Sequence, residues 1–251
     1  MKQMKTTGKL IDIFGDSFSC PCCKCNSDET WLEILEKKYH FTLNNESLHG
    51  TGAHWCIERF MGLKHHGDFL LFCLPDMNRL WLDYIPEEES STASMIHNFM
   101  VKNNFDLPDN DDPDYILDQS DRIFKDYESF YTSGLHRVLE VLIVSFIFSK
   151  HNKYEKILIW PSSGTGYPFQ NYNYTLEIPD NVHIVPKCLN FISHLENKNA
   201  RLDGMIFFGK DKRNNHLSFE NHEILAEQIV NFFSNRILPN PSEFKKNLYE
   251  M

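Results

Sequence analysis

The chain has 251 residues, enough for one large domain or two small ones, and 41% of them are hydrophobic, with 20 Phe, 10 Tyr and 4 Trp. Such a content of apolar and aromatic side chains excludes a disordered or low-complexity protein. A net charge of −10, from 25 Lys and Arg against 35 Asp and Glu, argues against nucleic acid as a partner, because phosphate binders usually carry a basic face. The sequence shows no secretion signal and no apolar run of the length that a membrane span needs, so we expect a cytoplasmic protein without a membrane partner.

Short apolar runs alternate with amphipathic segments along the chain. In chain order we predict a strand at Lys9–Phe14, a helix at Glu29–Tyr39, a strand at Phe41–Leu43, a helix at Ala53–Met61, a strand at Asp68–Leu74, a helix at Asp121–Lys150, strands at Lys156–Trp160 and Met205–Phe208, and a helix from Phe219 to about Phe233, with Ser218 as its N-cap. The segment Asp106–Asp121 departs from the calcium-loop pattern and is predicted to be a solvated loop. The alternation of strands and helices indicates a parallel sheet covered on both faces, and therefore one three-layer α/β/α domain that spans residues 1–251.

Candidate functional residues follow the early strands, in loops that we expect to meet at the carboxyl edge of the sheet. Gly15-Asp16-Ser17 follows the first strand, Asn45-x-Ser47-x-x-Gly50 the second, and Leu74–Arg79 the third, while Asn214-Asn215-His216-Leu217-Ser218 stands directly before the last helix. With these four blocks in order from Phe14 to His222, the chain resembles the SGNH (GDSL-like) hydrolases, a family of serine esterases and lipases built on a flavodoxin-like parallel sheet.

The resemblance implies a serine hydrolase that cleaves a carboxylic ester of a small molecule or carbohydrate, with a carbohydrate O-acetyl group as one candidate. Ser17 is then the nucleophile and His216 the base, since an imidazole removes a hydroxyl proton near neutral pH. The oxyanion hole would consist of the backbone N–H groups of Ser17 and Gly50 and the side-chain amide of Asn78. This chemistry requires neither a cofactor nor a metal ion.

Three further residues are candidates for contact with the substrate. His49 stands beside Gly50, and Tyr167 belongs to an aromatic-rich stretch that follows the Lys156–Trp160 strand. Asp16 adjoins the predicted nucleophile, but an aspartate at this place has an alternative role, which is to brace its own turn.

Two of the blocks depart from the family pattern. The third block lacks the family's glycine, so Asn78 is only the nearest candidate for the last oxyanion donor. The family has an aspartate three residues before the histidine, where this chain has Arg213, which cannot accept a hydrogen bond from an imidazole. Asp211 is therefore the candidate for orienting His216. These departures favour the main alternative, a non-catalytic binding or structural module that keeps the fold.

Four cysteines crowd into the segment Cys20–Cys25, directly after the predicted nucleophile loop. Clustered thiolates suit zinc or copper(I), which makes a metal or redox protein the third alternative. A structural zinc site usually draws paired ligands from two separate segments, and a second segment is missing here. We therefore predict no metal site and, in a reducing cytosol, mostly free thiols.

Overall fold

The computed structural model describes residues 8–20, 29–48, 51–75, 136–162, 177–186, 188–189, 217 and 219–244. Its elements in chain order are β1 (Leu10–Phe14), α1 (Trp31–Lys37), β2 (Thr42–Asn45), α2 (Ala53–Gly62), β3 (Phe69–Phe72), α5 (His136–Ser149), η2 (His151–Lys153), β4 (Lys156–Ile159), β5 (Val182–Ile184), α8 (Phe219–Asn235) and η4 (Pro241–Glu243).

The five strands form one sheet in the order β2-β1-β3-β4-β5, and every neighbouring pair is parallel. This is the order of flavodoxin-like sheets, in which ligands bind beyond the carboxyl ends of the strands. Because β1 lies between β2 and β3, the loops that follow these three strands leave the sheet side by side. The register pairs Ile11 of β1 with Leu43 on one side and with Phe69 on the other.

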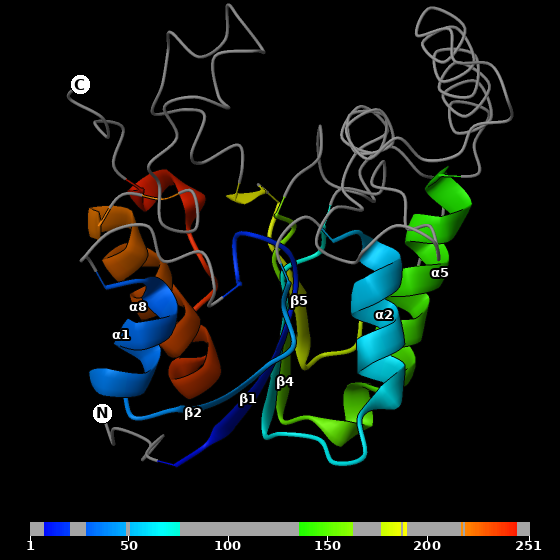
Figure 1. The fold of residues 1–251 in the computed structure, drawn as a ribbon, viewed down its shortest axis with the longest axis horizontal. Helices are drawn as coiled ribbons and strands as arrows, with labels where there is room; N and C mark the ends of the chain where they lie inside the picture. The colour runs from blue at the N-terminus through cyan, green and yellow to red at the C-terminus, as the bar shows by residue number, and fades with distance from the viewer. Residues whose placement is uncertain are drawn as a thin grey trace, which may run out of the picture.

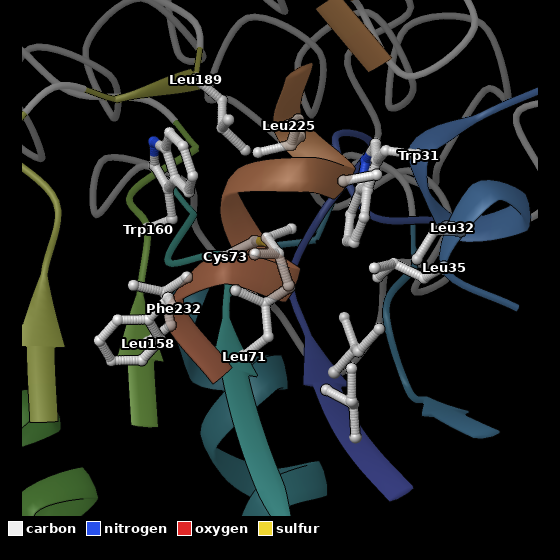
Figure 2. Close-up of a cluster of buried hydrophobic side chains, with 14 of the residues drawn as sticks. Trp31, Leu32, Leu35, Leu71, Cys73, Leu158, Trp160, Leu189, Leu225 and Phe232 are labelled. Carbon is white, nitrogen blue, oxygen red and sulfur yellow. The ribbon is translucent and has the colours of Figure 1, made fainter. Parts of the chain in front are cut away.

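Helices cover both faces of the sheet, as Figure 1 shows, with α1 and α8 on one side and α2 and α5 on the other. Successive residues of a strand point to opposite faces, so Ile13 packs in the cluster of α1 and α8 and Phe14 in the cluster of α2 and α5. Figure 2 shows the first cluster, in which Trp31 of α1 and Leu225 of α8 pack over Leu71 of β3. The described residues thus form three layers.

A buried carboxylate, Asp12, holds the middle of β1 to three other segments. Its Oδ1 accepts a hydrogen bond from the Asn44 side chain at 2.8 Å, and its Oδ2 accepts from the backbone N–H of Gly67 at 2.7 Å and the hydroxyl of Tyr154 at 3.0 Å. Burial raises the pKa of the Tyr154 phenol, and the nearby Asp12 raises it further, so the hydroxyl stays a donor. Asp12 is 0% exposed, and each of its oxygens is satisfied by a donor.

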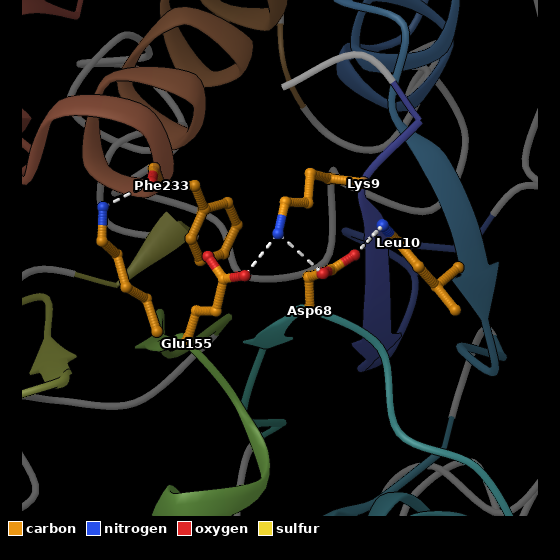
Figure 3. Close-up of polar contacts among 6 residues, drawn as sticks. Lys9, Leu10, Asp68, Glu155 and Phe233 are labelled. Carbon is orange, nitrogen blue, oxygen red and sulfur yellow. Dashed lines mark hydrogen bonds and ion pairs between the residues drawn. The ribbon is translucent and has the colours of Figure 1, made fainter. Parts of the chain in front are cut away.

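An ion-pair network joins the amino ends of β1, β3 and β4. The ammonium of Lys9 donates to Asp68 at 2.8 Å and to Glu155, and Asp68 also accepts from the backbone N–H of Leu10 at 2.8 Å (Figure 3). These hydrogen bonds raise the pKa of Lys9. Burial by itself would raise the pKa of Asp68, but the bonds from Lys9 and Leu10 outweigh it and hold that pKa below its ordinary value.

A buried lysine caps the carboxyl end of α8. The Nζ of Lys156 in β4 donates to the carbonyl of Phe232 at 3.1 Å and to that of Phe233. Both carbonyls belong to the last turn of the helix, where carbonyl groups have no partner within the helix and where a positive charge is favourable. Burial lowers the pKa of Lys156, and the positive charge of Arg236 adds to this effect.

The structure confirms the predicted elements that fall on described residues, with boundaries shifted by at most two residues: four strands, the helices over α1, α2 and α8, and the second half of Asp121–Lys150. It adds β5, which the sequence prediction missed. The predicted strand Met205–Phe208, the loop Asp106–Asp121 and the N-cap Ser218 lie outside the described residues. No helix in the described part of the chain is long and apolar enough to cross a membrane.

Candidate functional site

The loop after β1 is almost entirely buried, and Ser17 is its exception. Asp16 and Ser19 are 0% exposed and Phe18 is 4% exposed, whereas Ser17 is half-buried and keeps part of its surface in contact with solvent. The loop leaves the carboxyl end of β1, a central strand of the sheet. This is the edge where a parallel sheet presents its ligand-binding loops.

Asp16 shapes this loop with both of its carboxylate oxygens. Oδ1 accepts the backbone N–H of Phe18 at 3.1 Å, which forms an Asx turn around Ser17, and Oδ2 accepts the hydroxyl of Ser162 at 2.9 Å. The carbonyl of Asp16 accepts the backbone N–H of Ser19 at 3.0 Å. Asp16 thus braces its own turn, the alternative that the sequence raises, and contact with a substrate would require this buried carboxylate to turn outward.

Gly15 is required at this place by space rather than by backbone conformation. A Cβ on Gly15 would lie 2.2 Å from Oγ of Ser19, 2.7 Å from Cβ of Cys73 and 2.9 Å from the carbonyl oxygen of Cys73. The two atoms of Cys73, the residue directly after β3, are not the end of a flexible side chain, so they cannot move away without moving the strand. The glycine therefore lets the loop after β1 approach the neighbouring strand.

The loop after β2 is fastened to the loop after β1. The carbonyl of Gly15 accepts the backbone N–H of Leu48 at 3.2 Å, and the Thr51 hydroxyl, which donates to the carbonyl of Leu48 at 2.7 Å, lies 3.5 Å from the same Gly15 oxygen. The side chain of Asn45 bridges the two loops, since its Nδ2 donates to the carbonyl of Ser19 at 2.8 Å and its Oδ1 accepts the backbone N–H of Ser47 at 2.9 Å. The structure thereby brings the first two sequence blocks together.

Trp31 connects the loop after β1 to the first turn of α8. Its indole Nε1–H donates to the carbonyl of Phe18 at 3.0 Å, and its backbone N–H donates to Nδ1 of His222 at 3.2 Å. Trp31 is the first residue of α1, so this N–H group has no partner within its own helix and is satisfied by the imidazole. Leu217, which is 3% exposed, packs in the same cluster as Trp31. Leu217 and His222, described residues of the last sequence block, are thus linked through Trp31 to the loop that carries Ser17.

The capping of α1 fixes where Trp31 stands. Thr30 is the N-cap and accepts the backbone N–H of Glu33, while the Glu33 carboxylate accepts the backbone N–H of Thr30 at 3.0 Å. This capping box starts the helix at Trp31 and so directs one N–H toward α8.

The described cysteines do not supply a reactive thiol. Cys73 lies beside Asp16 and Ser19, where burial first and the Asp16 carboxylate second raise the pKa of its thiol and keep it protonated. Cys56, Cys73 and Cys188 are buried thiols that form no disulfide, as the sequence predicted, but the prediction of a reduced thiol is wrong at Cys20, which is disulfide-bonded. The partner of Cys20 lies outside the described residues. Among the residues that the structure describes, no three His, Cys, Asp or Glu side chains gather into a group that could hold a metal ion.

Of the predicted site residues, the structure describes Ser17 and Asp16. The remaining ones lie outside the described residues, and their roles stay predictions; they are His49, Gly50, Asn78, Tyr167, Asp211 and His216. Sequence reasoning missed Trp31, Asn45 and Ser162 as residues that hold the Ser17 loop. Only Asn45 carried a signal, because it begins the second block.

Comparison of the chain with protein-family models, with curated proteins and with solved structures found no match.

Proposed function

We propose that this protein is a serine hydrolase of the SGNH type, which cleaves a carboxylic ester through an acyl-enzyme on Ser17. The observation that carries the proposal is the pair of hydrogen bonds made by Trp31, because they tie the Ser17 loop to the helix that begins just after His216. Residues more than 190 positions apart in the chain are thereby anchored to one tryptophan. A hydroxyl and an imidazole from these two segments are what nucleophilic catalysis on an ester needs.

In the proposed reaction, Ser17 Oγ attacks the ester carbonyl while His216 takes the hydroxyl proton. His216 then gives this proton to the departing alkoxide, and the acyl group stays on Ser17. A water molecule, deprotonated by the same imidazole, attacks the acyl-enzyme. The bond between the acyl carbon and Ser17 Oγ then breaks, His216 returns the proton to Oγ, and the carboxylic acid is released. Asp211 is the candidate for orienting His216, since Arg213 cannot accept its N–H.

The proposed oxyanion hole consists of Ser17, Gly50 and Asn78, as the resemblance implies, and the described contacts of the first two loops bear on its first two members. The backbone N–H groups of Phe18 and Ser19 donate within the turn. The resemblance to the SGNH hydrolases assigns the first oxyanion donor to the backbone N–H of Ser17. Leu48 and Thr51, on either side of the segment that contains Gly50, both contact the carbonyl of Gly15, which supports Gly50 as the second donor.

The decisive experiment is labelling with a fluorophosphonate probe, which reacts with an activated serine, followed by peptide mass spectrometry. Wild-type protein is expected to carry one adduct, on Ser17, and to hydrolyse an acetyl ester. Ser17→Ala should lose both, and His216→Ala should slow labelling at least about a hundredfold. Ser149→Ala is the matched control, because Ser149 is an exposed serine at the end of α5.

The outcome also decides between this proposal and the non-catalytic module. If folded wild-type protein acquires no adduct and hydrolyses no ester, the hydrolase proposal is wrong. The non-catalytic binding or structural module is then favoured, because Arg213 replaces the family's aspartate and the third block lacks the family's glycine.

A further inference from the structure

Ser162 is a buried serine that stands two residues beyond Trp160, on the same edge of the sheet as Ser17. The backbone N–H of Trp160 donates to the carbonyl of Phe72 at 2.9 Å, and that of Ser162 donates to the carbonyl of Leu74 at 2.8 Å. These two bonds continue the pairing of β3 and β4 past the ends of both strands. Ser162 is 0% exposed and therefore has a fixed position relative to the sheet.

The Ser162 hydroxyl has one proton and two acceptors within reach. Its Oγ lies 2.9 Å from Oδ2 of Asp16 and 3.1 Å from the carbonyl oxygen of Leu74. The Leu74 carbonyl already accepts the backbone N–H of Ser162, whereas a carboxylate is the stronger acceptor because it is charged. The proton therefore goes to Asp16.

We infer that Ser162 is a positioning residue for the nucleophile, and this inference rests on the proposed role of Ser17. One oxygen of Asp16 accepts the Phe18 N–H within the loop, and the other accepts the Ser162 hydroxyl beyond β4. Two fixed contacts set the orientation of the carboxylate. The turn that carries Ser17 closes on that carboxylate, so its position depends on a residue 146 positions away in the chain.

The hydrogen bond between Ser162 and Asp16 matters for the proposed reaction because it affects the position of Ser17. A nucleophile must lie within hydrogen-bond reach of its base and in line with the carbonyl, and small displacements cost much of the rate. Without the Ser162 hydroxyl, one oxygen of a fully buried carboxylate loses this hydrogen bond. The Asp16 side chain would then rotate toward another donor and take the turn with it.

The test is a double-mutant cycle of Ser162→Ala and Asp16→Asn, with Ser149→Ala as the matched control on the far helix. The rate constant for fluorophosphonate labelling of Ser17 is measured well below the unfolding temperature, together with amide hydrogen exchange at Phe18 and Ser19. Ser162→Ala is expected to slow labelling about tenfold and to speed exchange at both amides. In the Asp16→Asn background its effect should be clearly smaller, because the two residues act through one contact.

The inference is overturned if Ser162→Ala labels at the rate of the Ser149→Ala control, or if the two single effects simply add. A purely structural role would lower the unfolding temperature and leave the labelling rate of the folded protein unchanged. If wild-type protein is not labelled at all, the hydrolase proposal has failed, and hydrogen exchange then decides about Ser162 alone. Faster exchange at Phe18 and Ser19 supports a tie between Ser162 and the loop, and wild-type exchange refutes it.

Discussion

Replacing Gly15 by alanine tests the packing of the Ser17 loop against β3. The new methyl group would stand 2.7 Å from Cβ of Cys73 and 2.9 Å from its carbonyl oxygen, and neither atom can move without β3. Overpacking of this kind costs about 2–3 kcal/mol. At about 2–4 °C per kcal/mol for a chain of this length, the unfolding temperature should fall by about 4–12 °C. Labelling of Ser17 should also slow, because the loop must shift to relieve the clash.

The experiment has two measurements. Circular dichroism monitors thermal unfolding, and the labelling rate is measured at roughly 20–30 degrees below the midpoint of each variant, where the native state dominates. Two other glycines supply the controls. A Cβ on Gly67 would lie 2.8 Å from the carbonyl oxygen of Leu10, far from the loop, so Gly67→Ala should lower stability and leave the labelling rate unchanged. Gly62, at the end of α2, has no atom within 4 Å of such a Cβ, so Gly62→Ala should raise stability by about 0.4–1 kcal/mol. A Gly15→Ala variant as stable and as reactive as wild type would refute the packing described for the loop.

Three further predictions concern buried or paired charges. Asp12→Ala removes the acceptor of the Gly67 N–H and of the Asn44 amide and one of the two partners of the Tyr154 hydroxyl, which also lies 2.9 Å from Nδ1 of His66. The change should cost about 3 kcal/mol in urea unfolding; a loss under 1 kcal/mol, roughly that of one exposed contact, would contradict the network. Lys9→Met should cost about 0.5 kcal/mol at pH 7. The pKa of Asp68 is depressed in the folded state, so the difference from wild type should begin to shrink only as pH falls below about 4, the ordinary value for an aspartate, and should be lost as Asp68 becomes protonated; a difference that does not change with falling pH would argue against the ion pair. Burial lowers the pKa of His183 in the folded state, so on acidification the unfolded chain binds this proton at a higher pH than the folded chain does. The free energy of unfolding therefore falls as pH drops below about 6.5. In chemical denaturation, His183→Leu should make this free energy less dependent on pH, and an unchanged pH dependence would refute the assignment.

Much of the fold could be predicted because a parallel sheet covered on both faces needs apolar strands. The run Asp68–Leu74 is apolar without alternation, and β3 is buried along its whole length. The helix α1 was predictable from the spacing of its buried side chains, Trp31, Leu32, Ile34 and Leu35. The strand β5 was missed because it has only three residues, with the half-buried His183 in the middle, and its pairing with β4 is not a local property of the sequence.

The candidate site was predictable only where a local motif carried it. Gly15-Asp16-Ser17 is contiguous, so its position after the first strand could be read from the sequence. The contacts that hold it are not contiguous: Trp31 meets His222 across 191 positions, and Ser162 meets Asp16 across 146. Neither Trp31 nor Ser162 belongs to a motif or a periodic pattern that would mark it as anything but an ordinary core residue.

Helix α8 is fixed to the rest of the protein at each end by a different kind of partner. His222 in its first turn receives the Trp31 N–H, and the carbonyls of Phe232 and Phe233 in its last turn receive the ammonium of Lys156. Helix α8 cannot shift along its axis without breaking the hydrogen bond to His222 or those from Lys156. The axial position of α8 is therefore set by α1 at one end and by β4 at the other.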